Sequence, residues 1–359
     1  MFELTNEQRE CFALAPVCDK WERIEIKASR CDCFKTYIYL DGNEIVKCIL
    51  SSQSDYSEYE LSEKVSPDRK YLLPKTAKGK PTPLTSSNLL KRKGVGMRLN
   101  YKGKNVHLYN EITECSYYFN TYLADEISDL DGFSRWVENW CNETTDDDRT
   151  DILRFSQQNR KHIRYQEGDV FRFKIGRRLY GYGRILLDYD KMRKNKEPFW
   201  DIFMLKPLVC SVYHIVTDRD DVTVEELKHL SSLPSIVVSD FSIFYGENEI
   251  IGNLPVTDNE DYPIMYGNSI SFKEKAVCYQ CGKTFRKIEN CTELFSGYRN
   301  NGVAMNVFNF KLNILLQCIK ENSNAPYWTL YFADTVDCDL RNPKNADKLK
   351  QIKEQFGLK

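Results

Sequence analysis

The feature of the chain that most constrains its fold is a series of short apolar segments joined by tight turns that contain glycine. The two clearest pairs are residues 37–40 with 44–50, around Asp41-Gly42-Asn43, and residues 95–101 with 105–109, around Lys102-Gly103. Glycine readily adopts the positive φ angles that short hairpin turns require, so each pair predicts two antiparallel strands. A chain built from such hairpins is expected to form antiparallel sheets.

Three helices are predicted in the first half of the chain. Thr85 can cap a short helix that runs through residues 89 and 90. Apolar residues then recur at positions i, i+3, i+4 and i+7, which places Phe133, Trp136, Val137 and Trp140 on one face of an amphipathic helix. The next helix is expected to begin near Thr145, because three aspartates follow it and suit the positive end of a helix dipole. It is expected to run towards Arg160.

After residue 160 the pattern returns to strands, which are predicted at residues 169–175, 180–187, 208–216, 235–244 and 249–254. A short helix is expected after Thr223, and residues 307–319 predict a buried helix near the C-terminus. Strands grouped with a few helices indicate an α+β fold with mainly antiparallel sheets. We predict two domains, residues 1–160 and 161–359, the second a curved sheet or partial barrel with a C-terminal helix.

Composition excludes several classes of protein. Hydrophobic residues make up 42% of the 359 residues and charged residues 29%, which excludes disordered, collagen-like and coiled-coil chains. The 51 basic and 52 acidic residues give a net charge of −1, so no global field draws the chain to nucleic acid or to a membrane. No membrane-spanning segment and no secretory signal is predicted. With 13 scattered cysteines, the chain is expected to be cytoplasmic and to carry free thiols.

Charge is nevertheless uneven along the first domain. Residues 69–104 contain eleven basic residues and no acidic one: Arg69, Lys70, Lys75, Lys78, Lys80, Lys91, Arg92, Lys93, Arg98, Lys102 and Lys104. Residues 125–151 contain ten acids and only two basic residues. Either these segments are solvated faces that partly neutralise each other in the fold, or one of them is an interaction surface.

Two candidate chemical sites involve cysteine. Cys278 and Cys281 have the spacing of half a zinc ribbon, but Cys291 is the one nearby third ligand, and the strand-like flanks argue against a redox pair. Cys210 and His214 share one face of a predicted strand, which is either a nucleophilic pair or a core histidine beside a buried thiol. At Cys278 and Cys281 we expect a hairpin with two free thiols, and for His214 we expect a histidine in the core. We expect the protein to bind no metal and no cofactor.

Signatures of catalysis are otherwise missing from the sequence. There is no phosphate-binding loop, no dinucleotide-binding glycine motif and no Ser in a nucleophile elbow. The four histidines show none of the spacings of hydrolytic metal centres. The sequence therefore favours a protein that is not an enzyme, with a hydrolase of unrecognised type as an alternative.

The most informative stretch comprises residues 167–173, which read Glu-Gly-Asp-Val-Phe-Arg-Phe, and residues 180–186, which read Tyr-Gly-Tyr-Gly-Arg-Ile-Leu. Physically it is a hairpin, in which two glycines allow a sharp bend or the close approach of another backbone. The stretch resembles the opening of the immunity protein 26 family, whose members typically begin with a strand reading GDVF followed by one reading YGYGR. Later segments at 207–213 and 249–253 are similar to that family as well, so the resemblance covers roughly residues 165–260.

This resemblance implies a bacterial immunity protein that binds and neutralises a cognate polymorphic toxin encoded nearby, by stoichiometric occlusion and without turnover. Tyrosine and arginine dominate the energetics of protein interfaces. The expected contacts are therefore the exposed residues of the hairpin: Arg177, Arg178, Tyr180, Tyr182 and Arg184. Core packing is the alternative for the two tyrosines. A nucleic-acid-binding or regulatory protein that uses residues 69–104 remains the rival function.

Overall fold

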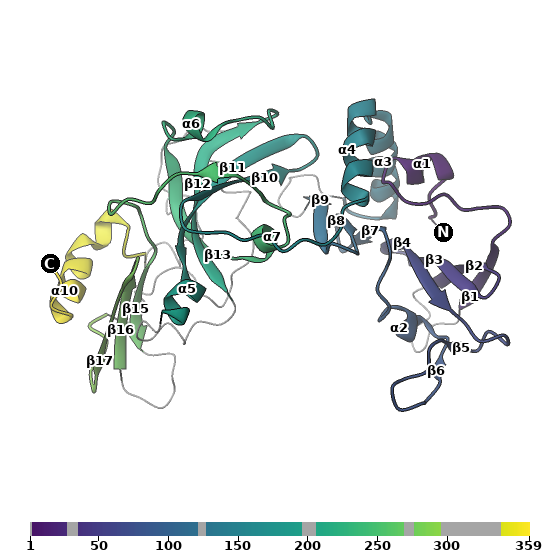
Figure 1. Ribbon diagram of the computed structural model, residues 1–359, viewed down its shortest axis with the longest axis horizontal. Coiled ribbons are helices and arrows are strands. Elements are labelled where there is room, and N and C mark those ends of the chain that lie inside the picture. Colours follow the sequence, from purple (N-terminus) through teal and green to yellow (C-terminus); the bar gives the residue numbers. More distant parts are fainter. Residues whose placement is uncertain (1, 27–34, 121–126, 196–205, 269–275, 296–338) are drawn as a thin grey trace. The chain divides into compact units, whose positions relative to one another are not determined.

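The computed structural model describes residues 2–26, 35–120, 127–195, 206–268, 276–295 and 339–359 (Figure 1). The chain divides into two compact units, Met1–Lys161 and His162–Lys359. Each unit combines antiparallel sheets with a few helices, so the predicted α+β class is confirmed.

The first unit is built on a seven-stranded antiparallel sheet with the strand order β1-β2-β3-β4-β7-β8-β9. Its strands are β1 Glu22–Ile26, β2 Lys35–Asp41, β3 Glu44–Ser51, β4 Asp55–Lys64, β7 Met97–Lys102, β8 Asn105–Asn110 and β9 Cys115–Phe119. The predicted hairpins are β2–β3, which turns at Gly42, and β7–β8, which turns at Gly103. Both glycines have a positive φ, as the turns require.

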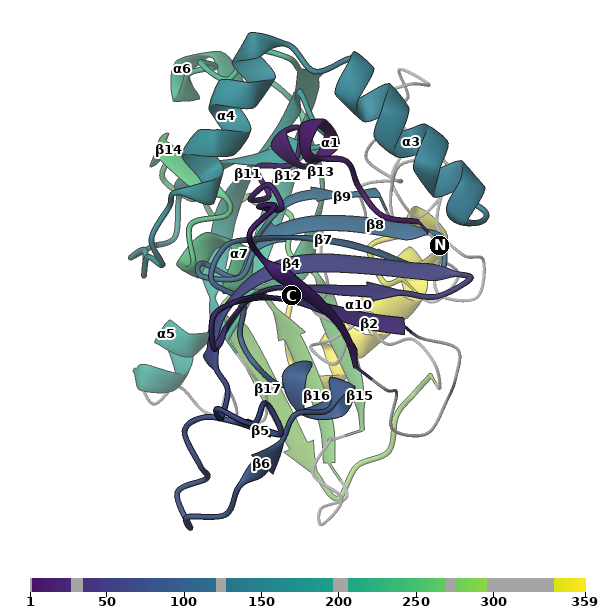
Figure 2. The same cartoon turned by 90° about the vertical axis from the view of Figure 1, so that its right-hand side faces the viewer.

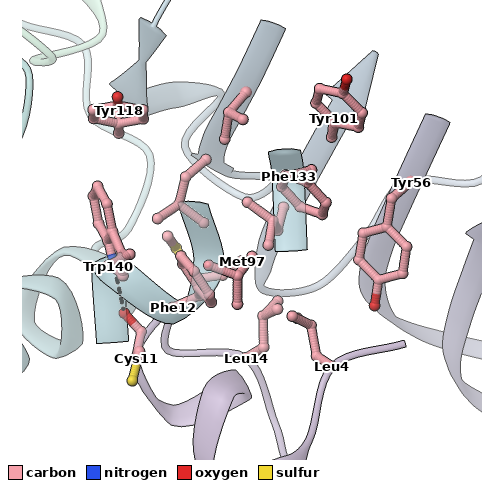
Figure 3. Packing of buried hydrophobic residues seen from close by; sticks show 14 of the residues in the cluster. Leu4, Cys11, Phe12, Leu14, Tyr56, Met97, Tyr101, Tyr118, Phe133 and Trp140 are labelled. Atoms are coloured by element: carbon pink, nitrogen blue, oxygen red, sulfur yellow. Dashed lines mark hydrogen bonds between the residues drawn. The ribbon is translucent and has the colours of Figure 1, made fainter. Parts of the chain in front are cut away.

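Three helices cover one face of this sheet: α1 Asn6–Glu10, α3 Leu130–Asn142 and α4 Asp146–Ser156 (Figure 2). The predicted apolar face of α3 supplies Phe133 and Trp140 to the core (Figure 3). The ring of Phe133 stacks on Tyr101 with centroids 4.7 Å apart, and Trp140 Nε1 donates to the Cys11 carbonyl at 3.2 Å. The predicted cap at Thr145 is confirmed, although α4 ends at Ser156 and does not reach Arg160.

The opposite face of the sheet is partly covered by the segment between β4 and β7. This segment contains the small hairpin β5 Tyr71–Leu72 with β6 Thr82–Pro83, and the helix α2 Ser86–Leu89, which Thr85 caps as predicted. Leu72 and Leu89 are fully buried there against the sheet. The first unit therefore has apolar cores on both sides of one sheet.

A cluster of buried charges lies on the face of the sheet that α1 covers. The carboxylate of Glu58 accepts from Lys47 Nζ and from Arg9 Nε, both at 2.7 Å, and from the Tyr56 hydroxyl at 2.5 Å. Glu58 and Lys47 are completely buried, and Arg9 is 3% exposed. Arg9 comes from α1, so this cluster fastens the N-terminal segment to the middle of the sheet.

The second unit contains a five-stranded antiparallel sheet with the order β13-β12-β11-β10-β14. Its strands are β10 Asp169–Ile175, β11 Leu179–Asp188, β12 Pro207–Thr217, β13 Ser232–Ser239 and β14 Glu249–Asn253. The pairing register shifts at several points along β10, β11 and β12, and such irregularities bend and twist strands. The result is the predicted curved sheet; its described strands end in two edges, β13 and β14, and do not close a barrel.

Short helices and a second sheet complete this unit. The helices are α5 Tyr189–Lys194, α6 Val224–Leu227, α7 Phe241–Phe244 and α10 Ala346–Gln355, preceded by a 3₁₀ turn at Pro343–Asn345. The second sheet is β15 Ile264–Asn268, β16 Ala276–Cys281 and β17 Thr284–Glu289. It packs against α10 through Tyr266, Tyr279 and Ile352.

The second half of the chain differs from the prediction at one strand and has a C-terminal helix that was not predicted. The strand predicted at 235–244 is correct only as far as Ser239, because the chain turns at Asp240 into α7. The buried helix predicted at 307–319 lies outside the described residues, and α10 was not predicted. No helix in the described part of the chain is long and apolar enough to cross a membrane.

We expect residues 162–359 to fold cooperatively without the first unit. The physical reason is that this segment contains its own sheets and its own apolar clusters. A fragment beginning at His162 should show one sigmoidal urea transition and dispersed amide signals. An insoluble or molten fragment beside a well-folded full chain would mean that the two units share a core.

Candidate partner-binding surface

The hairpin of β10 and β11 is held by pairs of phenylalanine and glycine on adjacent strands. Phe171 lies opposite Gly183, and Phe173 lies opposite Gly181. A Cβ atom built on Gly183 would stand 2.5 Å from the Phe171 ring, and one built on Gly181 would stand 2.4 Å from the Phe173 ring. The two glycines therefore provide the space in which the buried phenylalanine rings lie over the neighbouring strand.

Gly168 and Asp169, at the start of the same motif, fasten β10 to β14. Gly168 has a φ of +91°, which favours glycine, and its carbonyl accepts from the backbone N–H of Leu254 at 2.8 Å. The Asp169 carboxylate accepts from Asn253 Nδ2 and from the backbone N–H of Gln166, both at 2.8 Å. These motif residues hold the sheet together.

Tyr182 is not exposed, contrary to our expectation. Its side chain is completely buried among Val170, Tyr213, Val222 and Leu227, and its hydroxyl donates to the Arg219 carbonyl at 2.7 Å. The reason is that the chain between β12 and α6 folds back over this face of the sheet. Tyr182 therefore belongs to the core, which was the alternative that we gave for the two tyrosines.

Arg184 is also buried, with 7% of its surface exposed, and it forms an ion pair with Glu260. Glu260 in turn accepts a hydrogen bond from the Thr257 hydroxyl at 3.3 Å. Arg184 therefore ties β11 to the loop before β15. The expectation that it is exposed is wrong, because it faces the same covered side of β11 as Tyr182.

The remaining three residues lie at the exposed end of the hairpin. Arg178 is exposed, and Arg177 and Tyr180 are half-buried. The Arg172 guanidinium lies 5.0 Å from the centre of the Tyr180 ring and is itself held by Glu249 at 2.6 Å. Arg177, Arg178 and Tyr180 thus lie at or beside the turn of the hairpin and are at least partly exposed, whereas Tyr182 and Arg184 are buried.

Cys278 and Cys281 lie in β16, and a tight turn at Gly282 leads into β17, so the predicted hairpin is confirmed. Because they are three residues apart in a strand, their side chains point to opposite faces of the sheet. Cys278 packs with Leu186 and Val209, whereas Cys281 packs with Tyr279 and other residues that line α10. Without a change in the strand, these two sulfurs cannot bind one zinc ion together.

Burial governs the chemistry of Cys210 and of His107. Burial raises the pKa of the Cys210 thiol far above its ordinary value, and His214 is only half-buried, so it is not the core histidine we expected. In the first unit, His107 Nε2 lies 2.9 Å from Ser116 Oγ, but burial and the nearby Arg98 lower the pKa of His107 to about 4. Such a histidine is a weak base at neutral pH.

The basic segment at 69–104 is partly neutralised, but its five ion-pair partners lie outside the acidic segment at 125–151, so these pairs do not show the two segments neutralising each other. Five of its residues form ion pairs with acids of the same unit, namely Arg69 with Glu22, Lys70 with Asp68, Arg92 with Glu63, Lys93 with Glu114 and Arg98 with Glu111. The other six are lysines that are exposed and make no ion pair with any described residue. Three of them, Lys75, Lys78 and Lys80, lie on the loop between β5 and β6.

Comparison with known proteins gives one result. Residues 166–276 match the model of the immunity protein 26 family, so the resemblance that we predicted from the hairpin is confirmed over this part of the second unit. No curated protein and no solved structure matches the chain.

Proposed function

We propose that this chain, whose residues 166–276 match the immunity protein 26 family, is an immunity protein that binds and neutralises a cognate bacterial toxin. The family suggests an inhibitor and not an enzyme. The observation that carries the proposal is that the match falls within the second unit and covers its curved sheet.

The positions of the motif residues support binding through the surface that the sheet presents. Gly168, Phe171, Gly181, Tyr182 and Gly183 are all buried and build the scaffold. Residues that build a scaffold cannot distinguish one toxin from another, so specificity has to come from exposed side chains beside them. Arg178 is exposed and Arg177 and Tyr180 are half-buried, and tyrosine and arginine are the usual anchors of protein interfaces.

We further propose that neutralisation is stoichiometric occlusion in the cytoplasm, with the toxin domain encoded by a neighbouring gene as the partner. An inhibitor that acts by occlusion must match its target one to one. It must also bind tightly, because one free toxin molecule turns over many substrates; nanomolar affinity corresponds to about −12 kcal/mol. An interface of standard size can supply this when a few anchors are well buried.

Titration of the purified toxin domain with this protein should therefore abolish toxicity at an equimolar ratio. Replacing Arg178 or Tyr180 by alanine should weaken binding by about 1–3 kcal/mol if they are anchors. Arg286→Ala is a matched control, because Arg286 is an exposed arginine of the same unit, on β17. Neutralisation by far less than one equivalent would mean turnover, and the occlusion mechanism would then be wrong.

Nucleic-acid binding is the second candidate function, favoured by the six exposed lysines of the basic segment. We do not expect it, because the chain as a whole is neutral and five cations of this segment are already paired. Contacts between lysine and phosphate weaken steeply with salt. Filter binding of labelled DNA at two salt concentrations tests this alternative, and salt-sensitive retention would support it.

A further inference from the structure

The short helix α7, Phe241–Phe244, carries a cluster of aromatic rings at the surface of the second unit. The ring centres of Phe241 and Tyr245 are 4.9 Å apart, and those of Phe244 and Tyr245 are 5.0 Å apart. On its other side, Phe244 stacks on the imidazole of His162 at 4.8 Å, with the two planes 15° apart. We call His162, Lys206, Phe241, Phe244 and Tyr245 the α7 surface.

The side chain of Phe241 is unusually exposed to solvent for a large apolar residue. It is 58% exposed, more than any other large apolar side chain in the described part of the chain, whereas Ile243 in the same turn is completely buried. Exposing an aromatic ring to water costs free energy that burial against a partner would recover. Aromatic residues are common anchors of protein interfaces, and an exposed aromatic ring beside partly buried rings is typical of such an anchor.

The backbone holds this cluster in a defined position. The Ile163 N–H donates to the Phe244 carbonyl at 2.7 Å, and the Asn248 N–H donates to the Ser242 carbonyl at 2.7 Å. Asn248 Nδ2 also donates to the Ser242 hydroxyl at 3.0 Å. A preorganised anchor loses less conformational entropy on binding than a mobile one.

Two of the exposed charges beside the rings are positive, and one, that of Glu247, is negative. Lys206 Nζ lies 5.3 Å from the centre of the Phe244 ring, and Arg164 is exposed two residues after His162. The nearest carboxylate along the chain, Asp240, is buried and accepts from the Tyr165 hydroxyl at 2.9 Å, so its charge lies beneath the surface and not on it. Glu247, beyond Tyr245, already has a partner of its own. An acidic surface would complement these cations.

We propose that the α7 surface is the main anchor for the toxin, with Phe241 entering an apolar pocket whose rim is acidic. This inference rests on the proposed function. A protein partner fits better than single-stranded nucleic acid, because the rings stand at 52° and 73° to one another and do not form a row of parallel faces on which successive bases could stack. Nucleic acid is therefore an outcome to be tested.

The test measures binding of the full chain and of its variants to the purified toxin domain encoded beside it. Phe241→Ala should raise the dissociation constant at least tenfold. Lys206→Glu should also weaken binding, by a factor that shrinks as salt is raised. The matched control is Leu294→Ala, because Leu294 is 49% exposed in the same unit and should leave binding unchanged.

The outcomes separate this inference from the proposed function. If the natural protein binds the toxin and Phe241→Ala binds it equally well, the inference is wrong and the function stands. If the natural protein does not bind the toxin, both the proposed function and this inference are wrong. If Phe241→Ala lowers the free energy of unfolding of the full chain much more than Leu294→Ala does, the ring is covered by the chain itself. If Phe241→Ala instead abolishes binding of a single-stranded oligonucleotide and spares the toxin, the partner is nucleic acid.

Discussion

Replacing Glu58 by alanine should destabilise the first unit by about 3–5 kcal/mol, because it leaves two cations buried without a counter-charge. Lys47 and Glu58 are completely buried, and Arg9 is 3% exposed, so water cannot replace the lost carboxylate without opening the core. Such a loss is a large part of the stability of an ordinary domain. Urea unfolding followed by the fluorescence of Trp136 and Trp140, which pack in the core of the same unit, measures it.

A matched substitution on the surface of the same sheet provides the control. Glu22 pairs with Arg69 at 2.6 Å, but its side chain is 57% exposed, so Glu22→Ala should cost less than about 1 kcal/mol. If Glu58→Ala costs no more than Glu22→Ala, the buried cations have found other partners and the cluster does not fasten α1 to the sheet.

The same carboxylate predicts a dependence on pH. Burial by itself would raise the pKa of Glu58, but Lys47 and Arg9 outweigh it, and the pKa lies below its ordinary value. A carboxyl whose pKa falls on folding stabilises the folded protein above its unfolded pKa, and this stabilisation is lost as the pH falls through the folded pKa. Below about pH 4.3 the natural protein should lose this contribution. Glu58→Ala should show a weaker acid dependence.

Much of the local structure could be predicted because it depends on neighbouring residues. The hairpin turns follow from Gly42 and Gly103, and the helix starts follow from Thr85, Thr145 and Thr223, each of which accepts a backbone hydrogen bond as a cap. The end of β13 could not be predicted in this way. Residues 241–244 read as a continuation of an apolar strand, and their turn into α7 is accompanied by contacts with Ile163 and Tyr165, about 80 residues earlier.

The burial of individual side chains could not be predicted from the sequence either, because it also depends on contacts between distant residues. We expected Tyr182 and Arg184 to be exposed, and only the fold shows that the chain after β12 covers their face of β11. Likewise, Lys47 and Glu58 are typical surface residues by type, and nothing nearby in the sequence indicates that Arg9 joins them in the interior. The family motif was recognised because it consists of residues that build the sheet, and for that reason it identifies few contacts.

Tyr182 gives the sharpest test of that distinction between scaffold and contact. Tyr182→Ala should lower the free energy of unfolding of the second unit by about 3–5 kcal/mol, because it empties a fully buried site and leaves the Arg219 carbonyl without its 2.7 Å hydrogen bond. Tyr182→Phe keeps the ring and should cost only about 0.5–1.5 kcal/mol. Tyr180→Ala, two residues away on the same face but half-buried, should cost less than Tyr182→Ala while weakening toxin binding more. Thermal or urea unfolding must accompany each affinity measurement, since an unfolded variant also fails to bind. A Tyr182→Ala protein that keeps its stability and loses affinity would show that Tyr182 reaches the toxin, and the assignment of the motif to the scaffold would then be wrong.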